Sequence, residues 1–335
     1  MRFLALHDES FKQALLYDPP RNLWKEAMSG RHDIIGCAPE RINTPAFKSM
    51  LESSIFKNKF GFCVVDEAHL VIPWSRSFRE AYQSIGTVRA LVPSNTTFLA
   101  MSGSMDPKIG RPKTQNMLGF QPGRFHDVSL PIDRQDLIYG ACILKHSIHG
   151  TEFPDLAWLV PDNLAGPESI RTTLIAVNTI AIANALVKWL RTQLKAFVTP
   201  ERGLVFPFHS IIPQEERIQT LLELEQGLVR IVVATTAANV GLDMEVKDVI
   251  ILDLPADFES MTQWNGQASQ DGSGGRVVIY APDEIRVENT FDLHGDPTTK
   301  KKKMSDTALI ARQAYRSKCA PGFVDYFNPG DLKCH

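Results

Sequence analysis

The residues whose types and spacing point most clearly to chemistry form the string Asp66-Glu67-Ala68-His69. The string begins at the last residue of the run Phe60–Asp66 (FGFCVVD), which has the length and apolar character of a buried strand. Two adjacent carboxylates at the end of a strand can divide the work of nucleotide hydrolysis, because one can hold Mg²⁺ through water while the other orients the attacking water. The alternative reading is an acidic turn that merely ends a strand.

An aromatic and basic stretch follows the acidic string. Trp74, Phe78 and Arg79 lie within Val71–Tyr82. An aromatic ring can stack on any base, and an arginine adds positive charge and cation–π attraction, so the stretch suits contact with nucleic acid. A cluster of core aromatics under a loop is the alternative.

Further segments surround these two in a fixed order. They are Cys37-Ala38-Pro39-Glu40-Arg41, Ser102-Gly103-Ser104, Asp133-Arg134-Gln135-Asp136-Leu137, Thr173–Asn178, His209 after an apolar run, and Ala234–Asp243 (ATTAANVGLD). In this order the segments resemble the RecQ-like branch of the superfamily 2 DNA helicases, with its PER-type segment, DEAH box, aromatic-rich loop, S/T-A-T element, lobe connector and motifs IV and V. The resemblance extends from about Leu23 to Pro282.

The resemblance implies two RecA-like lobes that close on ATP and Mg²⁺ and move 3′-to-5′ along single-stranded or forked DNA. It implies roles in DNA repair and recombination, no membrane partner, and a location in the nucleus of a eukaryote or otherwise in the cytoplasm. The catalytic set that it implies is Asp66 with Mg²⁺, Glu67 with the water, His69 and Gln263. Ser102, Ser104 and Asp243 are implied to serve the nucleotide, and Trp74, Phe78, Arg79, His209, Thr235 and Thr236 the nucleic acid. Hydroxyls at these positions also suit an ordinary turn between a strand and a helix.

Two departures from the family pattern put ATP turnover in doubt. The sequence contains no G-x-x-x-x-G-K-[ST], so the amide cradle and the lysine of a phosphate-binding loop are missing. The position of motif VI reads QWNGQASQDG, so the family's arginines are replaced by Trp264, Gln267 and Gln270. An arginine finger contributes about 10³- to 10⁵-fold to turnover, and glutamine carries no charge. We therefore expect a defective ATPase.

Cysteines near the end of the chain resemble the start of the family's zinc-binding subdomain. Cys319, Cys334 and His335 provide at most three ligands, whereas structural zinc takes four. We expect no folded zinc site, and free thiols are the alternative. The resemblance also implies that the chain begins inside the first lobe and ends within this subdomain.

The elements that must position these residues alternate as in α/β proteins. Helical spacing of apolar residues predicts helices over Ile180–Phe197 and Pro213–Leu228. We expect a first lobe over residues 1–146, a hinge over 147–169, a second lobe over 170–283, and a linker with a helical tail over 284–335. Predicted buried strands are Asp33–Pro39, Phe60–Asp66 and Thr97–Ser104 in one sheet, and Thr172–Asn178, Gly203–His209, Val229–Thr235, Lys247–Asp253 and Gly275–Tyr280 in another.

Composition limits the class of protein. The 335 residues carry 36 Lys and Arg against 38 Asp and Glu, which excludes binding of nucleic acid by bulk positive charge. Five scattered cysteines do not form a disulfide framework, and the first ten residues lack the apolar core of a secretory signal. Three hypotheses remain: an active helicase, a catalytically inactive nucleic-acid-binding paralogue, and a non-functional gene fragment.

Overall fold

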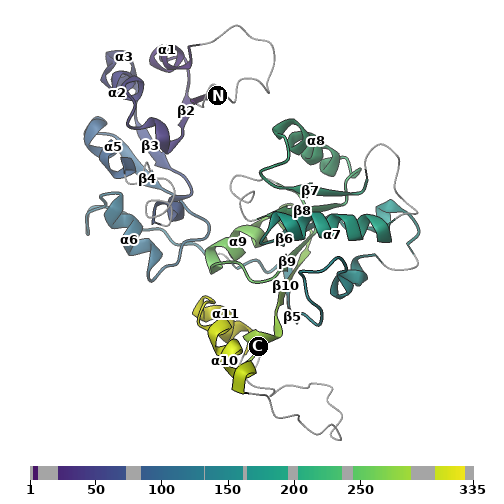
Figure 1. The fold of residues 1–335 in the computed structure, drawn as a ribbon. Helices are drawn as coiled ribbons and strands as arrows, with labels where there is room; N and C mark the ends of the chain where they lie inside the picture. Colours follow the sequence, from purple (N-terminus) through teal and green to yellow (C-terminus); the bar gives the residue numbers. More distant parts are fainter. Residues whose placement is uncertain are drawn as a thin grey trace, which may run out of the picture. The chain divides into compact units, whose positions relative to one another are not determined.

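The chain folds into two compact units, Met1–Ile132 and Asp133–His335, in the computed structural model (Figure 1). The structure describes residues 3–6, 22–72, 84–131, 133–160, 164–194, 203–235, 244–287 and 306–328. Within these ranges both units pair their strands in parallel and alternate strands with helices, so the predicted α/β class is confirmed. No helix in the described part of the chain has the length and apolar character needed to cross a membrane.

Among the described residues of the first unit, strand pairing gives two separate sheets of two strands. β1 (Phe3–Leu6) pairs in parallel with β2 (Ile34–Cys37), and β3 (Phe62–Val65) pairs in parallel with β4 (Thr97–Ala100). We expected β2, β3 and β4 in one sheet. That expectation is wrong for the described residues, in which β2 pairs with β1 and not with β3 or β4.

The helices of the first unit share one apolar core. They are α1 (Leu23–Met28), α2 (Pro45–Glu52), α3 (Ser54–Lys59), α5 (Ile85–Leu91) and α6 (Gly110–Met117), together with the 3₁₀ turns η2 (Pro39–Arg41) and η3 (Ala68–Leu70). The start of α2 follows from sequence, because the hydroxyl of Thr44 accepts a hydrogen bond from the Phe47 amide at 3.3 Å and Pro45 opens the helix. Phe47, Met50 and Val65 are buried together in this core.

One face of the β3–β4 pair stays outside that core. Cys63 and Phe98 pack against the core, whereas their neighbours on the opposite face, Phe62, Val64 and Leu99, are 65%, 49% and 40% exposed. The prediction that these strands are buried is therefore wrong for this face. The physical reason is that no described helix packs on it, so its apolar side chains remain in contact with solvent.

The second unit is built on one sheet of six parallel strands. In spatial order these are β5 (Leu137–Ile143), β10 (Gly275–Ala281), β9 (Asp248–Leu252), β6 (Thr173–Val177), β8 (Ile231–Thr235) and β7 (Val205–Phe208). The five strands predicted for this lobe are all present. β5 is an additional strand at the edge of the sheet.

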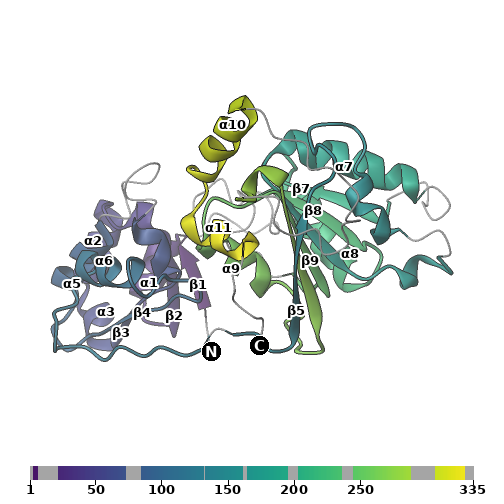
Figure 2. The ribbon, with the colours of Figure 1, turned by 90° about the horizontal axis from the view of Figure 1, so that it is seen from below.

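Helices cover both faces of this sheet. α7 (Ile180–Gln193) packs on one face, and α8 (Gln214–Glu225) and α9 (Phe258–Gly266) pack on the other (Figure 2). Every residue of β6, β8 and β9 is consequently buried, as expected for parallel strands with helices on both sides. Thr179 fixes the start of α7, because its hydroxyl accepts a hydrogen bond from the Ile182 amide at 3.2 Å.

The boundary between the units differs from the one that the sequence indicated. The chain divides after Ile132, and β5 joins the second sheet, whereas we expected the first lobe to reach residue 146. The expected hinge over 147–169 contains the 3₁₀ turns η5 (Pro154–Leu159) and η6 (Pro167–Ser169). Phe153 and Leu156 of this segment are buried in the core of the second unit, so the segment packs on that unit.

The final described helices also pack on the second unit. They are α10 (Asp306–Arg316), which follows the 3₁₀ turn η9 (Asp283–Ile285) in the described residues, and α11 (Pro321–Phe327). Phe323 stacks on Phe258 of α9 with ring centroids 4.2 Å apart, and the Arg316 guanidinium donates to the Arg286 carbonyl at 2.6 Å. The expected helical tail is thus part of the second core.

Candidate nucleotide and nucleic-acid site

The acidic string lies at the carboxyl end of β3. The Asp66 carboxylate accepts a hydrogen bond from the Glu67 amide at 2.9 Å, and Glu67 has a φ of 47°, in the left-handed region. This conformation costs a residue other than glycine about 1–2 kcal/mol. It turns the chain sharply after the strand, so that two consecutive carboxylates follow β3 at a bend.

Glu67, His69 and Ser102 come together across the ends of β3 and β4. The His69 Nδ1 atom lies 3.0 Å from the Ser102 Oγ and 3.2 Å from a carboxylate oxygen of Glu67. The Met101 amide donates to the Val65 carbonyl at 2.9 Å, and the Ala68 amide donates to the Met101 carbonyl at 2.8 Å. Parallel pairing therefore continues past both strands and fixes the contact between the acidic string and the Ser-Gly-Ser element.

Burial shapes the electrostatics of this cluster. His69 is only 4% exposed, and burial raises the pKa of Glu67, with the nearby negative charge of Asp66 raising it further. Ser104, which is buried, donates its amide to the Ser102 Oγ at 3.3 Å. The arrangement can hold a carboxyl group that keeps its proton to a higher pH than an ordinary glutamate does, beside an imidazole and a hydroxyl.

The second unit buries two of its predicted nucleic-acid contact residues, His209 and Thr235. His209 follows β7, is 2% exposed, and has its Nε2 atom 3.2 Å from the Asn184 Oδ1. Burial lowers the pKa of His209, so the ring is neutral at neutral pH. Thr235 ends β8 and is 4% exposed. Trp74, Phe78, Arg79, Thr236, Asp243 and Cys334 lie outside the described residues.

The motif VI segment turns two of its substituted residues inward. Trp264 in α9 is fully buried in the core, and Gln263 beside it is half-buried. The Gln267 side-chain oxygen accepts a hydrogen bond from the buried Met244 amide at 2.9 Å. Only Gln270 of the three substituted positions is exposed. Gln267 thus serves a backbone amide inside its own unit.

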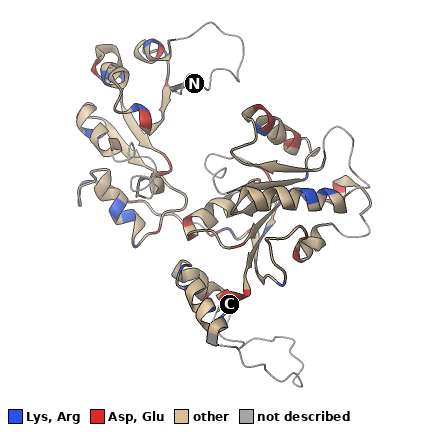
Figure 3. Cartoon of the chain, in the orientation of Figure 1, with Lys and Arg blue, Asp and Glu red and all other residues tan. Residues whose placement is uncertain are grey.

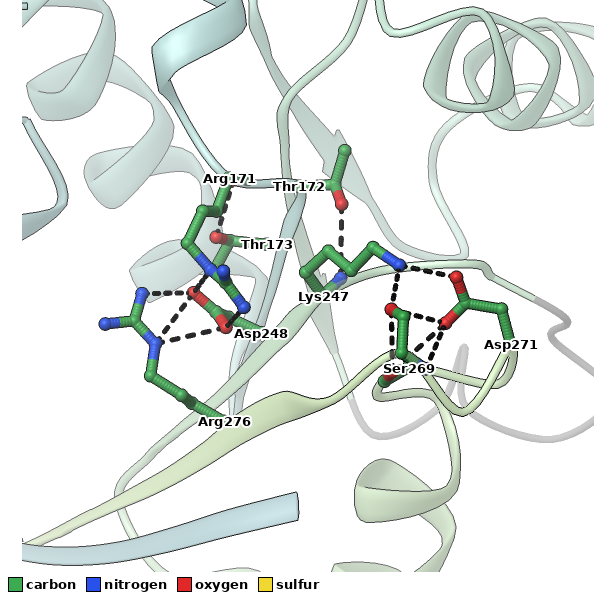
Figure 4. Close-up of polar contacts among 9 residues, drawn as sticks. Arg171, Thr172, Thr173, Lys247, Asp248, Ser269, Asp271 and Arg276 are labelled. Atoms are coloured by element: carbon green, nitrogen blue, oxygen red, sulfur yellow. Dashed lines mark hydrogen bonds and ion pairs between the residues drawn. The ribbon is translucent and has the colours of Figure 1, made fainter. Parts of the chain in front are cut away.

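Hydrogen bonds and an ion pair fix the end of the motif VI segment. Lys247 donates to the Asp271 carboxylate at 2.6 Å and to the Ser273 hydroxyl, and the first of these bonds is the main cause that holds the pKa of Asp271 well below its usual range (Figure 4). The Arg134 guanidinium donates to the carbonyls of Ala268 and Ser269 at 3.0 and 2.8 Å. The segment is therefore fixed to the start of β9 and to the residues that precede β5.

A second polar cluster, which the sequence did not indicate, lies at the amino ends of the strands. Asp248 is 1% exposed and accepts hydrogen bonds from the guanidinium groups of Arg171 and Arg276 (Figure 4). Burial alone would raise the pKa of Asp248, but the two arginines outweigh that effect and lower it. Because parallel strands carry loop-borne sites at their carboxyl ends, this cluster has a structural role.

Comparison with known proteins agrees with this geometry. Residues 160–272 match the helicase conserved C-terminal domain. The human ATP-dependent DNA helicase Q4 is 27% identical over 247 residues, which are 71% of this chain and 20% of that protein. The ATP-dependent DNA helicase RecQ of Pasteurella multocida is 20% identical over 265 residues, which are 76% of this chain and 36% of that protein. The chain is similar to these RecQ-like helicases over most of its own length. ATP-dependent RNA helicases match as well.

The fold of this RecQ-like chain agrees with a solved helicase structure. The Mycobacterium smegmatis helicase Lhr bound to single-stranded DNA and AMP-PNP superposes with a TM-score of 0.58 at 20% identity, covering 80% of this chain and 34% of that one. The predicted RecA-like architecture is thereby confirmed. The chain spans 20% and 36% of the lengths of the two curated relatives named above.

The residues of the RecQ-like chain fit a magnesium nucleotide only in part. Asp66 and Glu67 offer oxygen ligands of the kind that Mg²⁺ takes. In the second unit, the Gln267 side chain accepts a hydrogen bond from the Met244 amide, and it carries no positive charge that could contact a phosphate. Among the described residues, no cluster of three or more His, Cys, Asp or Glu could hold a metal ion. Cys319, a candidate ligand of an incomplete zinc site, donates its thiol to the Tyr315 carbonyl at 3.4 Å.

Proposed function

We propose that this RecQ-like chain binds single-stranded or forked DNA and is defective in ATP hydrolysis. The observation that carries the proposal is the inward orientation of Gln267 at an arginine position of motif VI, hydrogen-bonded to the Met244 amide. An arginine there would neutralise charge that develops on the transferred phosphate, an effect worth about 10³- to 10⁵-fold in turnover. A buried neutral amide has no such effect.

The DNA side of the proposal rests on the relatives. Two of them are named as DNA helicases, and the Lhr structure holds single-stranded DNA. The 3′-to-5′ polarity is the one implied by the RecQ-like resemblance. Charged side chains of both signs are scattered over the two units (Figure 3). Local contacts, and not bulk charge, would therefore have to hold the DNA.

An ATPase assay tests the catalytic part. We expect the full chain to show no DNA-stimulated ATP turnover above that of Glu67→Gln, which removes the carboxylate beside His69 and Ser102. Glu52→Gln is the matched control, because Glu52 is an exposed glutamate at the end of α2. DNA-stimulated turnover that survives in Glu52→Gln and disappears in Glu67→Gln would contradict the proposal and restore the active-helicase hypothesis.

A binding assay tests the DNA part. Fluorescence anisotropy of a labelled single-stranded oligonucleotide should show an affinity that falls between about 50 and 200 mM salt. Trp74→Ala should weaken binding, because stacking of a base on an aromatic side chain contributes about 1–3 kcal/mol. An RNA of the same sequence is the competitor, and tighter binding to the RNA would refute the preference for DNA.

A second hypothesis is that the chain is a fragment without a function of its own. The exposed apolar face formed by Phe62, Val64 and Leu99 favours it, because such a face is normally covered. Strong binding of a hydrophobic dye, together with non-cooperative unfolding and no DNA binding, would support this hypothesis. Cooperative unfolding with salt-sensitive DNA binding would exclude it.

A further inference from the structure

The two edges of the six-stranded sheet differ in how they are protected. β7, at one edge, has four residues and carries Pro207, which lacks an N–H and is a common way to blunt an exposed edge. β5, at the other edge, has seven residues, with the sequence LIYGACI, and contains neither a proline nor a charge. Ile138 and Tyr139 on it are 71% and 43% exposed. An uncharged apolar edge of this length is a template for pairing with another strand.

The backbone of β5 is oriented for such pairing. The Leu144 amide donates to the Ala281 carbonyl at 2.8 Å, and the Asp136 carbonyl accepts from the Gly275 amide at 3.2 Å, so even-numbered residues bond to β10. The alternation of a strand then directs the backbone N–H and C=O groups of Tyr139, Ala141 and Ile143 away from β10. Within the described residues, β5 pairs with no other strand.

We propose that β5 pairs antiparallel with the β5 strand of a second copy of this chain, about a two-fold axis at Gly140. In this register, Tyr139 and the partner's Ala141 would exchange both backbone hydrogen bonds. Ile138 would lie opposite the partner's Cys142. Gly140 would lie opposite its own copy in a non-hydrogen-bonded pair, where Cα atoms approach to about 4.5 Å. Every position of this pairing is uncharged, so nothing opposes it electrostatically.

The flanks of β5 favour this orientation and a second copy as the occupant. The exposed carboxylate of Asp133 precedes the strand, and the exposed ammonium of Lys145 follows it. Antiparallel pairing brings the acidic start of one strand near the basic end of the other, so both ends of the two-fold interface gain an opposite-charge pair. A parallel arrangement would set like charges beside each other. A closed two-fold contact of this kind also removes both exposed edges at once.

A cysteine at the two-fold axis tests the register. Gly140→Cys fits the fold, because a Cβ there would meet only the Val278 methyls, at 3.8 Å. A Cα separation of about 4.5 Å lies within the range for disulfides, about 4.4–6.8 Å. Mild oxidation should convert most of the full-length variant into a covalent dimer linked at position 140, as mapped by mass spectrometry of the peptides. Gly150→Cys, at an exposed glycine of the same unit, is the control and should remain uncrosslinked.

The molar mass in solution gives a second readout. Light scattering after size exclusion should give twice the 37.4 kDa of one chain for the unmodified protein. Ala141→Pro should reduce it to one chain, because it removes an outward N–H without touching the β10 ladder, while Ala141→Ser should leave the dimer intact. A monomer at about 100 µM, a dimer that survives Ala141→Pro, heterogeneous aggregates, or equal crosslinking of both cysteine variants would each overturn the proposal.

Discussion

Replacement of Asp248 by asparagine should strongly destabilise the second unit, although the two side chains have nearly the same shape. Asp248 is 1% exposed and accepts from the Nε and Nη2 atoms of Arg171 at 2.9 Å each, and from two nitrogens of Arg276. Asparagine keeps one acceptor and turns an amide donor toward a guanidinium. It also leaves two neighbouring cations without their shared anion.

The magnitude follows from these contacts. A hydrogen bond to a charged group contributes about 1.5–3 kcal/mol, and the substitution removes one side of each bidentate pair. The arginine side chains are 47% and 39% exposed, so water compensates part of the loss. We expect the free energy of unfolding to fall by about 2–3 kcal/mol. With a urea m-value of about 2 kcal/mol per M, the midpoint should fall by about 1–1.5 M.

The dependence on pH supplies the sharper test. The pKa of Asp248 is lowered in the folded state, so its contribution to stability is present above the unfolded pKa of about 3.9 and is lost as the pH falls through the folded value. Urea unfolding of Asp248→Asn and the unmodified chain should differ at pH 7 and converge on acidification. Glu245→Gln, an exposed carboxylate three residues earlier, should behave like the unmodified chain. A difference between Asp248→Asn and Glu245→Gln below about 0.5 kcal/mol at pH 7 would refute the reasoning.

Three further predictions concern the acidic string and the motif VI segment. Asp66→Asn should lower the pKa of Glu67, because it removes the nearby negative charge; carboxyl chemical shifts across a pH titration measure this, and an unchanged midpoint would leave burial as the whole cause. Gln267→Ala should lower the free energy of unfolding by about 1–3 kcal/mol by stripping the buried Met244 amide of its acceptor, as measured by urea unfolding. Trp264→Ala should cost about 3–5 kcal/mol through the cavity it leaves, and Trp264→Phe less; equal losses in the two would show that ring burial is not the cause.

Much of the second unit could be predicted from sequence because its strands are buried on both faces. Apart from one threonine each, the runs of β6 and β8 are apolar, and α7 carries a clear helical period with Thr179 at its start. β5 was missed because it follows the charged connector Asp133–Asp136 and lies at an edge, where burial leaves a weaker pattern. The segment over 147–169 looked like a hinge because proline and glycine mark breaks in structure, yet Phe153 and Leu156 anchor it in the core.

The candidate site, too, could be predicted from the sequence only in part. The carboxylates of Asp66 and Glu67 could be found from their place after an apolar run, and their meeting with Ser102 follows once β3 and β4 pair in parallel. The contact of Gln267 with Met244 could not be found, because it depends on how α9 is rotated against the sheet. The bonds from Arg171 and Arg276 to Asp248 join residues far apart in sequence, so no local pattern predicts them.

The hold of Arg134 on the second unit has a mechanical consequence. Arg134 lies just after the division at Ile132 and binds two carbonyls at the end of the motif VI segment. A force on the connector is therefore shared between the backbone path to β5 and the hydrogen bonds from the Arg134 guanidinium to Ala268 and Ser269.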